Sequence, residues 1–258
     1  MRALLPSLVA ALVGVACVGA TGGELVTFSA AAAGPEDATA TLTFTTDLGW
    51  NVTLTKATLH VGAIYLDQSE PVSGSQGTNC ILPGTYVAEV VSGIDVDLLS
   101  PAPQPFPTSG QGTTIPPALV GQVWLTQGDV NAPDQTPILV IAGTAEKDGM
   151  MMPFTGQVTI GASRQSSGSA GGADPICKEH IVSPIPTSVE VGTSGGLLLR
   201  ADPRLLFVNV DFSQLTPFSG GYGFTDDPTS AQYTQPSRNL YQNLHSSGAL
   251  YTFSWTDQ

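Results

Sequence analysis

TATLTFTT (residues 39–46), followed across the turn DLG (47–49) by WNVTLTKATLHVGAIYL (50–66), is the stretch that decides the fold. Apolar and polar residues alternate in both runs, which is the period of a half-buried β-strand, and Asp-Leu-Gly supplies the turn of a hairpin. In the second run the apolar phase shifts by one residue, so the pattern predicts a β-bulge near Lys56. The same pattern places His60 on the polar side of the strand.

Short runs of this kind recur along the chain. They are rich in β-branched residues and are separated by Gly, Pro, Asn and Asp, which favours an all-β fold over alternating helices and strands. The further predicted strands are 85–91, 119–126, 137–145, 154–161, 195–201, 205–212 and 250–255. One short helix is predicted at 237–247, where Leu240 and Leu244 share a face. The predicted fold is therefore all-β, a single antiparallel β-sandwich domain over residues 24–258.

Two long loops interrupt the predicted strands. Residues 100–117 contain six prolines and are typical of an extended, polyproline-like segment, while residues 162–175 are rich in Ser and Gly. Both loops belong to the same predicted domain, because the apolar strands on either side are needed for one core.

The N-terminus has the layout of an export signal over residues 1–20, with one early charge and an apolar run too short to span a bilayer. Two cleavage sites fit this run. Cleavage before Cys17 resembles the processing of a bacterial lipoprotein, in which the cysteine is acylated, whereas cleavage after Ala20 would release a secreted protein. The cysteine and the flexible Thr-Gly-Gly at 21–23 favour the first alternative. We therefore expect a lipid-anchored protein of the bacterial cell envelope, at the outer membrane or in the periplasm.

Export also determines how the cysteines are expected to pair. The chain has three, at Cys17, Cys80 and Cys177. Once Cys17 is acylated or removed, an even pair remains in an oxidising compartment, which predicts a disulfide between Cys80 and Cys177. No CxxC spacing is present, which argues against a cysteine-based metal site.

The charge balance excludes one class of partner. Twenty-one acidic residues stand against eight basic ones, and the formal net charge is −13. Nucleic-acid binding needs Lys and Arg to displace counterions, so we expect no nucleic-acid partner. An acidic surface suits cations, although it also serves solubility.

A serine motif, GTSGG (192–196), matches G-x-S-x-G. With His60 and either Asp95 or Asp97 it gives the chain order His, Asp, Ser of chymotrypsin-like proteases. The residues around Ser194 depart from that family, and a glycine-rich turn accounts for the motif. A serine hydrolase is therefore kept as an alternative function, and no catalytic residue is assigned.

One acidic loop, GDVNAPDQ (128–135), offers the oxygen ligands that Ca²⁺ prefers, on Asp129, Asn131 and Asp134. Its spacing is not that of an EF-hand, and an Asx-turn requires the same residues. The loop therefore favours a turn over a calcium site.

Histidine is scarce, since the chain has only three. The strand LTKATLHVGAIYLD (54–67) and the separated order His60, Trp124, His180, in an acidic exported β-protein, resemble the copper-binding proteins associated with methanobactin transport. The resemblance covers the strands from Trp50 to Tyr65 and from Leu205 to Phe212. It implies a copper site of two histidines and an oxidised tryptophan, which here would be His60, His180 and Trp124. Neutral imidazoles suit copper or zinc better than they suit hard cations.

Three functions stay open on these grounds. The preferred interpretation is an exported, lipid-anchored envelope protein that acts as a binding or structural module, with a membrane as its partner through the anchor. The first alternative is a periplasmic copper-binding protein, and the second is a chymotrypsin-like serine hydrolase.

Overall fold

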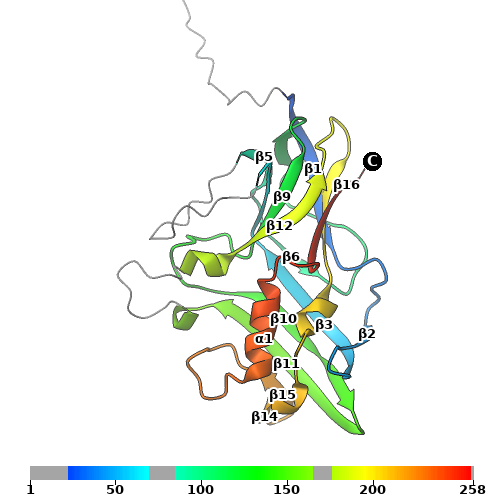
Figure 1. Ribbon diagram of the computed structural model, residues 1–258, viewed down its shortest axis with the longest axis vertical. Helices are drawn as coiled ribbons and strands as arrows, with labels where there is room; N and C mark the ends of the chain where they lie inside the picture. Colours follow the sequence, from blue (N-terminus) through cyan, green and yellow to red (C-terminus); the bar gives the residue numbers. More distant parts are fainter. Residues whose placement is uncertain (1–22, 70–84, 165–175, 257–258) are drawn as a thin grey trace, which may run out of the picture.

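Two β-sheets make up most of the protein in the computed structural model, which describes residues 23–69, 85–164 and 176–256 (Figure 1). Within these residues the larger sheet has nine strands. Their order is β12 (Ile181–Val189), β9 (Ala118–Trp124), β4 (Ala63–Asp67), β5 (Tyr86–Val90), β8 (Gly110–Thr113), β1 (Leu25–Ala33), β13 (Gly196–Ala201) and β16 (Tyr251–Thr256), with β7 (Gln104–Pro105) also paired to β1. The two end strands, β12 and β16, contact each other, so this sheet is nearly closed.

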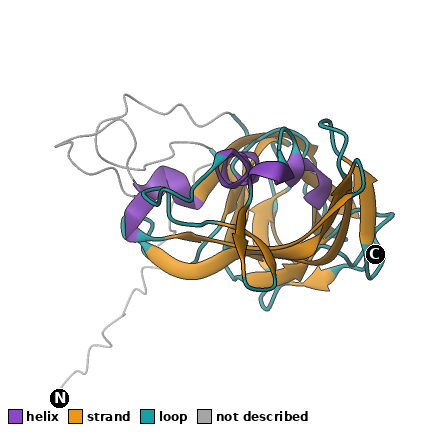
Figure 2. Ribbon diagram, turned by 90° about the horizontal axis from the view of Figure 1, so that it is seen from below, coloured by secondary structure: helices purple, strands orange, loops and turns teal. Residues whose placement is uncertain are grey.

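The second sheet occupies the lower half of Figure 1 and has seven strands among the described residues. Their order is β14 (Thr216–Phe218), β15 (Gly221–Phe224), β11 (Met150–Ile160), β10 (Asp134–Lys147), β3 (Asn51–Val61) and β2 (Leu42–Thr45), with β6 (Ile94–Asp97) also paired to β3. The helical segments are α1 (Gln235–Leu244) and the 3₁₀ turns η1 (Ala162–Arg164), η2 (Ile176–His180), η3 (Pro203–Phe207) and η4 (Phe212–Gln214). Figure 2 shows the helices gathered along one side of the strands.

The all-β prediction is confirmed, with one refinement of strand direction. Most pairs are antiparallel, but β1 pairs with β13 in parallel, and β11 pairs with β15 in parallel. Buried residues from both sheets form one contiguous hydrophobic core. None of the helices in the described ranges has the length and apolar content needed to cross a membrane.

The hairpin of β2 and β3 follows the sequence prediction closely. Gly49 has a φ of 79° in the turn, a conformation that glycine adopts without steric cost. The predicted bulge is confirmed: Lys56 pairs with Ala142 of β10 and Leu54 with Gly143, so Thr55 is the extra residue.

The single long strand predicted at 50–66 is in fact two strands in two sheets. The chain passes from β3 to β4 at Gly62, whose N–H donates to the Trp124 carbonyl oxygen at 2.7 Å. A Cβ atom at Gly62 would lie 2.1 Å from the carbonyl oxygen of Thr126. Only glycine fits this crossing between the sheets.

The prediction of a strand at 205–212 is wrong. The chain there forms η3 and η4, because the carboxylates of Asp202 and Asp211 accept hydrogen bonds from backbone N–H groups two residues later and start a 3₁₀ turn at each position. Phe207 and Phe212 stack at 5.7 Å and pack with Phe154 against the seven-stranded sheet. The apolar residues were therefore correctly expected to be buried, but in helical turns.

The remaining predicted elements are mostly confirmed. The helix spans Gln235–Leu244, two to three residues earlier than predicted, and both Leu240 and Leu244 are buried. Residues 100–117 are not a structureless loop, because they contain β7 and β8. The Ser/Gly-rich segment starts with η1, and its residues 165–175 lie outside the described part.

Candidate functional site

His180 is a buried polar side chain that contacts Thr126, next to Gly62, where the chain crosses from one sheet to the other. This crossing is called the junction of the two sheets. His180 ends η2, directly before β12, and only 1% of it is exposed. Its Nδ1 lies 2.6 Å from Thr126 Oγ1, while its Nε2 is buried and has no hydrogen-bond partner. Burial lowers the pKa of His180, so the neutral imidazole is favoured. The Ala132 carbonyl and Asp134 oppose this shift, but the geometry gives Nε2 no hydrogen bond to that carbonyl.

His60 lies near the end of β3, where β6 pairs with it. Its Nδ1 is 2.7 Å from Asp95 Oδ1, and the side chain is 14% exposed. The flanking residues Leu59 and Val61 are buried in the core, so His60 is on the polar face as predicted. The side chain is more enclosed than that of a solvated strand residue, and Asp95, its cross-strand neighbour on β6, lies beside it.

A chain of backbone contacts joins the two histidines to one junction. Two residues after His60, Gly62 packs against the Thr126 carbonyl and bonds to that of Trp124. Thr126 in turn contacts His180 through its side chain, and the His180 carbonyl accepts from the Leu125 N–H at 2.8 Å. The structure thus brings both predicted histidines to the place where the chain crosses between the sheets.

Asp134, at the start of β10, is an acidic neighbour of both histidines. Burial alone would raise the pKa of its carboxyl group. Hydrogen bonds from Thr136, together with electrostatic attraction to His180 and His60 when their rings are protonated, instead hold the pKa of Asp134 below its usual value. The carboxylate is therefore ionised and attracts positive charge to this junction.

Trp124 lies on β9, between β4 and β12, the strands that follow His60 and His180 in the chain. It pairs with Ala63 of β4 and Ile181 of β12. Its Nε1 donates to Gln122 Oε1 at 3.3 Å, and its ring centroid is 5.1 Å from that of Tyr65. Trp124 is thus adjacent to the histidine junction through the backbone, while its side chain belongs to a separate polar group.

That polar group contains a buried carboxylate that was not predicted from the sequence. Asp67 is fully buried, its Oδ2 accepts from Gln122 Nε2 at 2.6 Å, and its Oδ1 has no partner. Burial raises the pKa of the Asp67 carboxyl, and the hydrogen bond from Gln122 opposes the increase only in part. Its place at the end of a predicted apolar strand was the available signal.

A complete set of protein metal ligands is not assembled at the junction. Among residues 23–69, 85–164 and 176–256, no group of three or more His, Cys, Asp or Glu side chains is arranged to hold a metal ion. The residue that the structure relates to both histidines is Asp134, which interacts electrostatically with each of them.

The acidic loop forms Asx-turns. Asp129 Oδ1 accepts from the backbone N–H of Asn131 at 2.9 Å, and Asp134 Oδ1 accepts from that of Thr136 at 2.8 Å. Each bond uses one carboxylate oxygen of the loop, in agreement with a turn.

The structure joins only two members of the hypothetical serine triad. His60 and Asp95 are paired, but Ser194 lies in the exposed turn before β13, where its carbonyl oxygen accepts from Trp255 Nε1 at 2.9 Å. No described hydrogen bond links Ser194 to His60. Among the residues that the structure describes, Ser194 therefore has no hydrogen-bonded base.

The cysteine predictions fall largely outside the described residues. Cys17 and Cys80 both lie there. Cys177 is buried in η2 and is disulfide-bonded. Its pairing with Cys80 stays a prediction.

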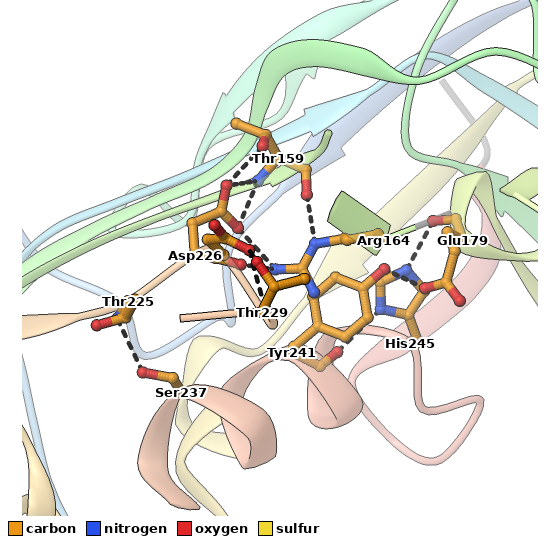
Figure 3. A network of polar contacts seen from close by, with 10 residues as sticks. Thr159, Arg164, Glu179, Thr225, Asp226, Thr229, Ser237, Tyr241 and His245 are labelled. Atoms are coloured by element: carbon orange, nitrogen blue, oxygen red, sulfur yellow. Dashed lines mark hydrogen bonds and ion pairs between the residues drawn. The ribbon is translucent and has the colours of Figure 1, made fainter. Parts of the chain in front are cut away.

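A second polar network lies behind η2 and is centred on Tyr241 of α1 (Figure 3). The Tyr241 hydroxyl donates to the Glu179 carboxylate, and the Arg164 guanidinium lies 3.5 Å from the centre of the Tyr241 ring. Burial and the charge of Glu179 raise the pKa of Tyr241, so the hydroxyl stays protonated and remains a donor. Arg164 also binds Asp226 Oδ1 at 2.6 Å.

Comparison with known proteins gives little beyond this geometry. No protein-family model matches the chain, and no curated protein does. A solved structure, MbnP from Methylosinus trichosporium, matches over 90% of this chain and 99% of that chain, with a TM-score of 0.39 and 12% sequence identity. At these values the similarity carries no argument about function, which therefore has to come from the residues of this chain.

Proposed function

We propose that this protein binds a transition-metal ion, with copper as the expected metal, at the junction of the two sheets. The Nε2 atom of His180 carries the proposal, because it is buried and has no hydrogen-bond partner. A buried polar atom without a partner costs about 1–3 kcal/mol. A metal ion that accepts the lone pair of this nitrogen would offset that cost.

The two histidines are prepared for metal binding in the same way. In each ring, Nδ1 faces an oxygen atom: Thr126 Oγ1 for His180 and Asp95 Oδ1 for His60. When Nδ1–H donates to such an oxygen, the tautomer is fixed and Nε2 carries the lone pair. Metal-ligating histidines almost always have such an outer partner.

The number and type of ligands favour copper. Imidazole nitrogens suit copper, zinc, iron and nickel. The described residues offer two imidazoles and no cluster of three His, Cys, Asp or Glu side chains. Univalent copper accepts a small number of nitrogen ligands, whereas zinc sites in proteins almost always use three or four protein ligands. The net charge of −13 and the ionised Asp134 support attraction of a cation.

A titration tests this proposal. Purified protein is titrated with copper(I) in competition with a chromogenic chelator, for wild type and for the His180→Ala and His60→Ala variants. We expect each substitution to weaken binding at least about 10-fold, since even outer partners of metal ligands contribute that much.

The matched control is Val182→Ala, which removes a side chain that is also 1% exposed, two residues from His180 on the core side. It should lose stability and keep the wild-type affinity. Unchanged affinity in both histidine variants would overturn the proposal.

We also propose that the protein works in the cell envelope, anchored through an acylated Cys17. The apolar run before this cysteine supports the anchor. So does the position of β1, which begins at one end of the long axis in Figure 1, opposite the end where β14 and β15 lie. An anchor just before β1 would leave the rest of the molecule extending away from the membrane.

A further inference from the structure

The peptide groups on both sides of His180 are held by hydrogen bonds. On one side, His245 Nε2 donates to the Glu179 carbonyl oxygen at 2.7 Å. This carbonyl belongs to the same peptide group as the His180 nitrogen, so the bond orients that peptide plane. On the other side, the Leu125 N–H donates to the His180 carbonyl oxygen.

Glu179 is held a second time, through its side chain. Its carboxylate accepts from the Tyr241 hydroxyl, and the ring of Tyr241 packs 4.3 Å from that of His245 (Figure 3). Tyr241 and His245 are one turn apart, at the end of α1, and His245 Nδ1 lies 2.9 Å from the Tyr241 carbonyl oxygen. The end of α1 thus holds η2 through both the side chain and the backbone carbonyl of Glu179.

Together these contacts leave one free group on His180. Its two flanking peptide groups are fixed, and its ring is oriented by Thr126 through Nδ1. The atom left without a partner is Nε2. An imidazole that is fixed in this way loses little conformational entropy when it binds a ligand.

We propose that Tyr241 and His245 are positioning residues for the metal site, acting through Glu179 to aim His180 Nε2. This inference rests on the proposed function of His180 as a metal ligand. Neither residue touches the metal. Their effect is on the affinity, because without them η2 and the His180 ring sample more orientations.

The test compares Tyr241→Phe with Ser237→Ala. The first removes the hydroxyl that binds Glu179. The second removes another buried hydroxyl of α1, which lies in the first turn of the helix and accepts from the Thr225 N–H at 2.8 Å. Both variants lose one hydrogen bond between α1 and a neighbouring segment, but only the first lies at the end of α1 that contacts η2. We expect copper(I) affinity to fall about 10-fold in Tyr241→Phe and to stay at the wild-type value in Ser237→Ala.

A second readout needs no metal. Nitrogen-15 NMR of the histidine rings should show one set of sharp His180 resonances in the metal-free wild type. Tyr241→Phe should shift or broaden them, and Ser237→Ala should leave them unchanged. If wild type fails to bind copper while the resonances respond as expected, the proposed function is wrong and the positioning role stands. Unchanged affinity and unchanged resonances in Tyr241→Phe would overturn the positioning role.

A pair of substitutions at His245 covers the case in which Tyr241→Phe does not fold. His245→Gln keeps a side-chain N–H donor that can reach the Glu179 carbonyl, whereas His245→Leu does not. The inference expects the His180 resonances to stay sharp in the first variant and to broaden in the second. Equal spectra in the two variants would contradict it.

Discussion

At the scale of single residues, His180 and His60 differ in burial and in the oxygen atom that faces Nδ1. His180 is almost fully buried and kept neutral, and its Nδ1 contacts a hydroxyl, whereas the Nδ1 of His60 faces the carboxylate of Asp95, which is itself exposed. A ligand at the junction would therefore be held firmly on the His180 side. On the His60 side the exposed Asp95 carboxylate would bring it closer to solvent.

The buried carboxyl group of Asp67 should make the stability of the protein depend on pH. The pKa of Asp67 is raised in the folded protein, mainly by burial, so the folded state binds this proton more tightly than the unfolded state does. Stability then falls as pH rises from the unfolded pKa of about 4 through the raised folded value, and it stays lower above that window. Asp67→Asn removes this loss. We expect the free energy of unfolding of the variant, minus that of wild type, to increase between about pH 4 and pH 8.

Urea unfolding at several pH values measures this difference. Asp148→Asn is the control, since Asp148 is exposed in the β10–β11 turn and has a positive φ that asparagine tolerates. Its difference from wild type should vary little with pH. A pH-independent difference for Asp67→Asn would show that its carboxyl group is not destabilised by burial.

At the scale of elements, alternation predicted most of the long strands, although it missed β1, in which Phe28, Ala30 and Ala32 are buried. The hairpin of β2 and β3, with its turn and its bulge at Thr55, could be predicted from the sequence. When the apolar phase shifts by one residue, an extra residue is needed to keep the apolar side chains on the core face. Strand β12 was missed because it contains Pro184 and Pro186, which lack the N–H donor of a regular strand. The segment 205–212 was assigned to the wrong class because a short apolar run does not separate strand from helical turn.

Gly62 connects β3 to β4, and we expect a substitution there to lower the stability of the fold strongly. Gly62→Ala would place Cβ 2.1 Å from the Thr126 carbonyl oxygen, and a backbone atom cannot move aside cheaply. We expect a loss of about 3 kcal/mol, the upper end of the usual cost of overpacking. Thermal and urea unfolding measure it.

Gly223→Ala is the matched control for Gly62→Ala. Gly223 also lies in a strand, β15, but its nearest neighbour to an added Cβ would be the Phe218 side chain at 3.4 Å, an ordinary contact. This variant should unfold close to wild type. Equal stability of the two alanine variants would mean that the crossing between the sheets tolerates a side chain.

At the scale of the whole molecule, the candidate site is a product of long-range topology. His180 and Thr126 are separated by 54 positions, and His60 and Asp95 by 35. The sequence could indicate each residue and its face, but no local pattern shows that β3, β9 and η2 meet at Gly62. The same holds for Tyr241 and Glu179, which are 62 positions apart. These contacts depend on the order of strands in two sheets, which local alternation does not encode.

The anchor is also a whole-molecule prediction. Protein recovered from the cell envelope should begin at Cys17 and carry acyl chains, because this cysteine closes the apolar export run. Mass spectrometry of the N-terminal peptide gives both answers. An unmodified N-terminus at Thr21 would indicate cleavage by ordinary signal peptidase and a secreted protein.

The central claim is that copper binds at the junction of the two sheets through His180 and His60. Crystals of the copper-loaded protein, measured on both sides of the copper absorption edge, test it most directly. The account predicts an anomalous difference peak within bonding distance of His180 Nε2, with His60 as the second histidine ligand. A peak at any other place on the molecule, or no peak in crystals of protein shown to contain copper, would contradict it.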